Sequence, residues 1–218
     1  MTVAYRRPGQ VCIEHTVEVP LDHADPTSPR IEVFVLEVVR PGKVDADLPV
    51  LLYLQGGPGH AAERPSSSAA WLDRALCDHR VLLLDQRGTG QSTPVTRQSL
   101  ESFTDVEKAA YVRHFRADSI VRDAEVVRRL LLGDRPWSLL GQSFGGFCAM
   151  TYLSLAPEGL AEVMIAGGLP DLTAGPDEVY RAAYPRARAH TERFFARYPG
   201  DREIAAQVVD HLAVCPWP

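Results

Sequence analysis

The chain has 218 residues, 45% of them hydrophobic and 23% charged, and a formal net charge of −5. This length allows one core, or one domain and part of another. The acidic balance argues against a nucleic-acid partner. The sequence contains no apolar run of about 18 residues, so it predicts no membrane span. Residues 1–8 lack the apolar core of a signal peptide, so we expect a cytoplasmic protein.

Two strands are expected near the N-terminus. Cys12 to Val19 alternates moderately and ends at Pro20, which predicts an edge strand, because proline donates no hydrogen bond to a sheet. Ile31 to Val39 alternates β-branched and polar residues and predicts a second strand. Together they predict an antiparallel start to the sheet.

A near-continuous apolar run, Val50 to Leu54, is typical of a strand covered on both faces. It ends in Gln55-Gly56-Gly57-Pro58-Gly59. Backbone N–H groups in such a loop can come close to a ligand, because glycine has no side chain in the way. A plain tight turn is the alternative interpretation.

Val81 to Leu84 predicts another buried strand, followed by Asp85-Gln86-Arg87-Gly88-Thr89-Gly90-Gln91-Ser92. We expect Asp85 and Arg87 to form a buried ion pair that fixes this loop beneath the Gly56-Gly57 loop. A solvated surface pair, worth little energy, is the alternative.

Three helices are expected before the next strand: Ala69 to Leu76, Thr104 to Phe115 and Asp118 to Leu132. In the third, Asp118 is the expected N-cap and Gly133 the C-terminal stop. Its predicted apolar face consists of Ile120, Val121, Ala124, Val127, Leu130 and Leu131. Its predicted solvent face carries Arg122, Asp123, Arg128 and Arg129.

Trp137 to Leu140 predicts a strand that leads into Gly141-Gln142-Ser143-Phe144-Gly145, and Phe144 to Leu155 predicts a helix. This strand, turn and helix is the context of a nucleophile elbow, in which a serine stands on a strained turn. Glycines two positions before and after the serine remove the Cβ atoms that would clash. A glycine-rich turn that merely packs strand against helix is the alternative.

Val163 to Ala166 predicts a further short strand, and the character of the chain changes from Pro170 onward. Pro176 to Tyr198 sets aromatic residues at helical spacing with arginines between them, and Ile204 to Leu212 predicts a last helix. Arginine beside aromatics can indicate nucleic-acid binding. The net acidity and the helical phase favour packing with a solvated face.

The four cysteines are widely spread and form no C-x-x-C pair, so neither a zinc site nor a redox motif is supported. Cys148 lies in the helix after the elbow, and we expect it to be a small buried apolar residue rather than a reactive thiol. Without a phosphate-binding fingerprint or a ligand cluster, the sequence implies no metal, nucleotide or organic cofactor.

The three motifs at Gln55, Asp85 and Gly141 have the order and about the spacing seen in proline iminopeptidases, which this chain resembles from about Val11 to Leu169. These are serine peptidases of the α/β-hydrolase fold that remove an N-terminal residue, usually proline. The early Pro20-Leu21-Asp22-His23 also resembles a segment of their larger members and of tripeptidyl aminopeptidases.

The resemblance implies that Ser143 is the nucleophile and that the backbone N–H groups of Gly57 and Phe144 form the oxyanion hole. The substrate would be a peptide with a free N-terminus. The first position of the glycine loop is often histidine in the family, and here it is Gln55. The implied fold is α/β, with a mostly parallel sheet and flanking helices. Residues 1–169 would form the N-terminal part of the core, and residues 170–218 the beginning of a helical cap.

The mechanism needs a histidine as base and an acid that orients it. In α/β-hydrolases both follow the serine. The order Ser143, Asp171, His211 is formally allowed, but His211 and His190 lie in helical patterns, and His60 is expected to be a loop residue. We therefore expect a chain truncated before the acid and the histidine, with an open sheet edge prone to self-association.

Two other interpretations remain open. One is a different α/β-hydrolase, such as an esterase, which acts on other small molecules. The other is a catalytically inactive fragment that binds a partner through its open sheet edge. The missing histidine is the feature that separates an active peptidase from this last interpretation.

Overall fold

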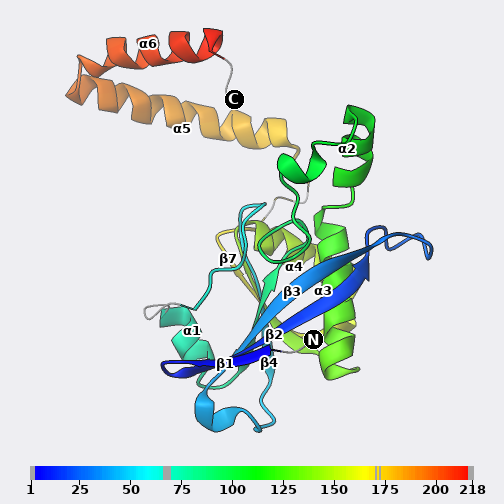
Figure 1. The fold of residues 1–218 in the computed structure, drawn as a ribbon. Coiled ribbons are helices and arrows are strands. Elements are labelled where there is room, and N and C mark those ends of the chain that lie inside the picture. The colour runs from blue at the N-terminus through cyan, green and yellow to red at the C-terminus, as the bar shows by residue number, and fades with distance from the viewer. Residues whose placement is uncertain (1–2, 66–69, 170, 172, 216–218) are drawn as a thin grey trace. The chain divides into compact units, whose positions relative to one another are not determined.

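A computed structural model describes residues 3–65, 70–169, 171 and 173–215. The chain groups into two compact units, Met1–Pro170 and Asp171–Pro218. The first unit holds a seven-stranded sheet with its helices, and the second holds two helices (Figure 1). Among the described residues, no helix combines the length and apolarity needed to cross a membrane.

The sheet has the strand order β1-β2-β3-β5-β4-β6-β7. Its strands are β1 (Val3–Arg7), β2 (Gln10–Pro20), β3 (Arg30–Val39), β4 (Val50–Leu54), β5 (Arg80–Asp85), β6 (Trp137–Gln142) and β7 (Leu160–Ala166). The pairings β1–β2, β2–β3 and β3–β5 are antiparallel, and those from β5 through β4 and β6 to β7 are parallel. Five of the seven strands thus run in one direction, as the sequence predicts for this sheet.

The edges of the sheet differ in part from the prediction. β1, which the sequence analysis does not identify, pairs with β2, so the prediction that β2 is an edge strand is wrong. All five residues of β1 are exposed and show no alternation, which explains why the pattern gave no signal. At the other edge, β7 pairs with β6 and with no further strand of the described residues. Self-association through this edge stays a prediction.

The helices of the first unit are α1 (Ala70–Ala75), α2 (Asp105–Val112), α3 (Ala117–Leu132) and α4 (Phe144–Leu155). α1 lies on one side of the sheet and α3 on the other (Figure 1). α4 packs with α3, and both contribute to the same core cluster, where Trp137 and Tyr152 are the largest fully buried side chains. Ala69, where we predict the first helix to begin, lies outside the described residues.

Helix α3 departs from its prediction in its charged residues. Its N-cap is Arg116 instead of Asp118, while Gly133 is the C-cap as predicted. Leu130, predicted on the apolar face, is 65% exposed. Asp123 and Arg128, predicted on the solvent face, are buried, and each has an ionic partner. Asp123 pairs with Arg87, which lies outside the helix, so a helical pattern cannot reveal it, whereas Arg128 pairs with Glu125 three positions earlier on the same helix.

Arg87 is the centre of a buried polar network. Its Nε donates to Asp123 Oδ2 at 2.6 Å, and its terminal nitrogens donate to the carbonyls of Leu21, His114 and Pro20 at 2.8–3.1 Å. His23 Nε2 lies 2.8 Å from Asp123 Oδ1. The predicted ion pair between Asp85 and Arg87 is therefore wrong.

The second unit consists of α5 (Pro176–Arg197) and α6 (Asp201–Val214). Within it, Arg202 lies with its guanidinium carbon 4.6 Å from the centre of the Phe195 ring and pairs with Glu192 at 2.6 Å. Arg202 lies outside the predicted run of arginines, and no described residue of α5 or α6 is buried, so the predicted packing of the aromatic face stays a prediction. That this unit begins a helical cap stays a prediction, and Pro170, Leu172 and the last three residues of the predicted cap lie outside the described residues.

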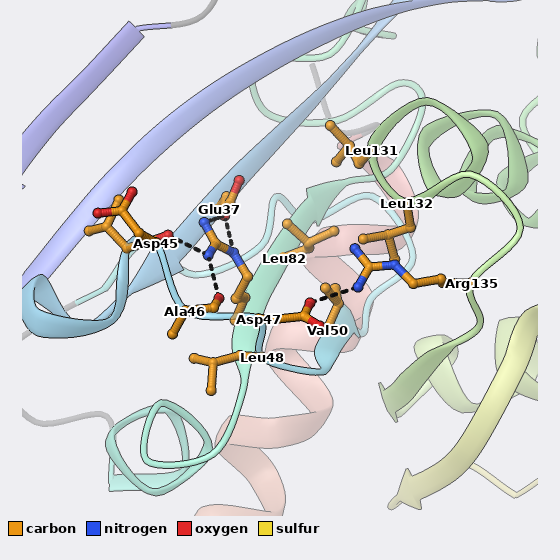
Figure 2. A pocket seen from close by; sticks show the side chains of 12 residues that line it. Glu37, Asp45, Ala46, Asp47, Leu48, Val50, Leu82, Leu131, Leu132 and Arg135 are labelled. Atoms are coloured by element: carbon orange, nitrogen blue, oxygen red, sulfur yellow. Dashed lines mark hydrogen bonds and ion pairs between the residues drawn. The ribbon is translucent and has the colours of Figure 1, made fainter.

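The N-terminal ends of β4 and β5 border a pocket of about 370 Å³ (Figure 2). Arg80 there donates to the carbonyl of Val44 at 2.7 Å and pairs with Glu37 at 2.6 Å. His15 Nε2 lies 2.8 Å from the other oxygen of Glu37. Burial by itself raises the pKa of Glu37, but the bond with His15 and the charge of Arg80 outweigh burial, so this pKa lies below its ordinary value.

Replacing Asp123 by alanine leaves the Arg87 guanidinium buried without its carboxylate. We expect the free energy of unfolding to fall by about 3–5 kcal/mol, the usual cost of breaking a buried pair from one side. The control is Asp118→Ala, which removes the exposed partner of Arg122 on the same helix and costs less than about 1 kcal/mol. Urea unfolding measures both, and equal losses would contradict the role assigned to Asp123.

Glu37→Gln tests the second polar cluster through its pH dependence. A depressed folded pKa stabilises the protein above the unfolded value of 4.5, and this stabilisation is lost as the pH falls through the folded pKa. We expect the free energy of unfolding of the variant to lie about 1–3 kcal/mol below that of the parent at pH 7. This difference in stability should narrow below pH 4.5. Urea midpoints between neutral and acidic pH measure this gap, with the exposed Glu32→Gln on the same strand as control. A gap that stays constant with pH would contradict the assignment.

Candidate active site

Ser143 stands between β6 and α4 on a strained turn. Its backbone has φ 52° and ψ −116°, and among the described residues other than glycine only Ser143 has a positive φ. Such a conformation costs on the order of 1–3 kcal/mol and persists only where the surroundings enforce it. The side chain is exposed at the end of the strand. This is the geometry that the sequence predicts for an elbow, while the role of Ser143 as nucleophile stays a prediction.

Close backbone packing enforces this turn. A Cβ atom added at Gly145 would lie 2.0 Å from the carbonyl oxygen of Leu54, and one at Gly141 would lie 2.3 Å from the carbonyl oxygen of Gly145. The backbone N–H of Ser143 donates to the carbonyl of Ala166 at 2.8 Å. The ends of β4, β6 and β7 therefore meet at the serine with no room for side chains at the two glycines.

The glycine loop after β4 lies directly beside the serine. A Cβ atom at Gly56 would come within 2.8 Å of Ser143 Cβ and 3.4 Å of Ser143 Oγ. Gly57 has a φ of 130°, a conformation that favours glycine. In the described part of the chain, the backbone N–H groups of Gly57 and Phe144 donate to no backbone carbonyl. Both groups are thus available to an external acceptor, as an oxyanion hole requires.

The loop after β5 supports the glycine loop through side chains. Gln86, which is buried, donates from Nε2 to the carbonyl of Gln55 at 2.9 Å. Asp85 is fully buried, accepts from the backbone N–H groups of Ala62 and Gln91 at 3.0 and 2.8 Å, and pairs with Arg64. The predicted link between the two loops therefore exists, but Gln86 makes it and not an ion pair of Asp85 with Arg87.

No histidine of the described residues hydrogen-bonds to Ser143. His15 and His23 lie in the polar clusters of Glu37 and Asp123. The ring of His60 lies 3.0 Å from where a Cβ of Gly57 would be, which fits the predicted loop residue. Asp171 accepts from the backbone N–H groups of Thr173 and Ala174, ahead of α5. His190 lies in α5 and His211 in α6, as the helical patterns predict.

Cys148 lies in α4, five residues beyond the serine, and is fully buried. Burial raises the pKa of its thiol to about 12, so the thiolate that would act as a nucleophile does not form near neutral pH. The prediction of a small buried apolar residue is confirmed. Within the residues that the structure describes, no group of three or more His, Cys, Asp and Glu side chains is arranged to hold a metal ion.

Two polar residues near the serine, Gln86 and Tyr53, are not among the predicted site residues. Gln86 lies within a predicted motif, between the charged residues Asp85 and Arg87. Tyr53 lies inside an apolar run that reads as core. The signal was a hydroxyl near the end of a buried strand, where a partner is expected.

Residues 49–208 match the family described as having the alpha/beta hydrolase fold, and this match covers most of the chain. The chain therefore belongs to the α/β-hydrolase fold family, and the predicted fold class is confirmed. It is 51% identical to a proline iminopeptidase from Aeromonas sobria over 205 residues, which make up 94% of this chain and 48% of the relative. It is 40% identical to a proline iminopeptidase from Aspergillus aculeatus, over 91% of this chain and 46% of the relative.

These matches confirm the resemblance to proline iminopeptidases that the three motifs indicate. The chain spans about half the length of these curated relatives. Among solved structures, a proline iminopeptidase-related protein from Thermus thermophilus has 22% identity and a TM-score of 0.46, covering 86% of this chain and 67% of that protein.

Gly145→Ala tests the packing around the serine. Because the added methyl group would meet the backbone oxygen of Leu54, we expect a loss at or above the usual overpacking cost of about 1–3 kcal/mol. Gly42→Ala is the matched control, since a Cβ at Gly42 meets nothing within 4 Å, and should change stability by less than about 0.5 kcal/mol. Urea unfolding compares the two variants, and a Gly145→Ala protein as stable as the control would contradict the packing argument.

Proposed function

We propose that this chain carries the nucleophile and the oxyanion hole of a serine aminopeptidase of the prolyl aminopeptidase type. The observation that carries the proposal is the exposed, strained Ser143 with the Gly56-Gly57 loop directly beside it. Two relatives are named proline iminopeptidases, and this chain spans about half the length of each, which supports an N-terminal proline as the residue released.

In this proposal, Ser143 Oγ attacks the carbonyl carbon of the substrate's N-terminal residue. As the C–O bond forms, the carbonyl oxygen becomes an oxyanion and accepts hydrogen bonds from the backbone N–H groups of Gly57 and Phe144. The C–N bond then breaks, and the departing amine takes up the proton that the serine lost. Water hydrolyses the acyl-enzyme and releases the N-terminal residue. The N–H donors of Gly57 and Phe144 are part of the backbone and are held in place before the reaction begins.

The proton transfers require a base. The relatives are about twice as long as the matched part of this chain. In α/β-hydrolases the acid and the histidine follow the serine in the sequence. We propose that both come from the part of that length that this chain does not span, and that residues 170–218 begin a helical cap.

The test treats the natural-length protein with a fluorophosphonate, which labels activated serines. We expect one label per molecule on the peptide that contains Ser143, and turnover of proline arylamides faster than that of short acyl esters. Ser143→Ala should abolish the label and lower kcat by about 10⁴-fold or more. Labelling that persists in Ser143→Ala would contradict the assignment of the nucleophile, and faster turnover of esters would favour an esterase. The 218-residue chain alone should label far more slowly, because no described histidine reaches the serine.

A further inference from the structure

We propose that Tyr53 is a positioning residue, whose hydroxyl fastens the glycine loop to the elbow and so holds the two oxyanion donors at one point. Its consequence for catalysis rests on the function proposed above. Tyr53 lies near the end of β4, Gln55 is the first residue of the glycine loop, and Gln142 is the residue before Ser143. We call these three side chains the Tyr53 clasp.

The clasp begins where the pairing between β4 and β6 ends. The register of β4 and β6 pairs Tyr53 with Leu140 and Leu54 with Gly141, and this is the last pair. Beyond it, one strand continues into the glycine loop and the other into the elbow. Since side chains alternate along a strand, Tyr53 and Gln55 point to the same face of the sheet. One more step of the register places Gln142 opposite Gln55.

The tyrosine hydroxyl contacts both glutamines. Its oxygen lies 2.5 Å from Oε1 of Gln55 and 2.8 Å from Oε1 of Gln142. A phenol has one proton to donate and lone pairs to accept with. It therefore donates to one amide oxygen and accepts from the amide N–H of the other glutamine, because the O and N of an amide exchange places by a simple flip. In this way a single hydroxyl bridges two segments that lie 87 residues apart in the chain.

The surroundings hold this hydroxyl in place and keep it protonated. Tyr53 is 7% exposed, and its ring packs on Trp71 with 4.7 Å between the ring centres. Burial, and to a lesser extent the charge of Glu63, raises the pKa of Tyr53 above its ordinary value. At neutral pH the hydroxyl thus has a proton to donate, and its position is fixed by the packing of the ring.

Gln55 is held on its other side as well. Gln86 Nε2 donates to its backbone carbonyl at 2.9 Å, while the Tyr53 clasp holds its side chain. The next two residues are Gly56, which packs against Ser143, and Gly57, a proposed oxyanion donor. Glycines have little conformational preference of their own, so the position of the Gly57 N–H depends on how firmly Gln55 is held.

The test is Tyr53→Phe, which removes the hydroxyl and keeps the ring against Trp71. Hydrogen exchange followed by mass spectrometry should show faster exchange in the peptides that cover residues 55–60 and 141–147, and no change in those from α3. In the natural-length protein, kcat for a proline arylamide should fall about 10- to 100-fold with KM nearly unchanged, because misplaced donors weaken binding of the transition state rather than of the substrate.

Tyr111→Phe is the matched control, because Tyr111 is a partly buried tyrosine that also packs on another aromatic ring and lies outside the site. It should change neither exchange near the serine nor kcat. Gln142→Leu removes the same clasp from the elbow side. We expect the double variant to lose little more kcat than either single variant, as for residues of one network.

Unchanged exchange at both segments in Tyr53→Phe would overturn the clasp. Faster exchange with unchanged kcat would overturn its positioning role, since a bond that serves stability alone would give that result. If the parent protein turns over no proline arylamide, the proposed function fails, and the exchange experiment still decides whether the hydroxyl fastens the two segments.

Discussion

The close approach of backbone segments around Ser143 is the constraint on which the rest of the site depends. The end of β4 meets the start of α4 at Gly145, where no Cβ atom fits. Contact at this distance makes the strained backbone of the serine tolerable, because neighbouring peptide groups fix the turn from several directions. The same contact brings the glycine loop beside the hydroxyl. Strain at the serine and access to backbone donors thus have one cause.

Much of this arrangement is visible in the sequence, for identifiable reasons. β4 and α4 have the bounds that the pattern predicts, because a continuous apolar run and a glycine-flanked turn leave few alternatives. The elbow and the glycine loop could be placed for the same reason. β1 could not, because a fully exposed strand carries neither alternation nor an apolar run.

The local sequence pattern could not predict contacts between residues that lie far apart in the chain. Asp123 has the phase of a solvent-facing residue in an amphipathic helix, yet Arg87, 36 positions earlier, holds it in the interior. Asp85 and Arg87 are close in sequence, yet they do not pair with each other. Asp85 pairs with Arg64, and Arg87 pairs with Asp123. The contacts of Tyr53 with Gln55 and Gln142 depend on strand order in the same way, since β4 and β6 are neighbours only once the sheet is assembled.

The network around Arg87 also has a consequence for how this part of the chain folds. One guanidinium binds the carbonyls at the end of β2, the carbonyl of His114 after α2, and the carboxylate on α3. A buried cation that lacks any of these partners is costly. Intermediates in which only some of the segments have met therefore gain little from burying Arg87. This favours cooperative, all-or-none assembly of segments that lie up to about a hundred residues apart.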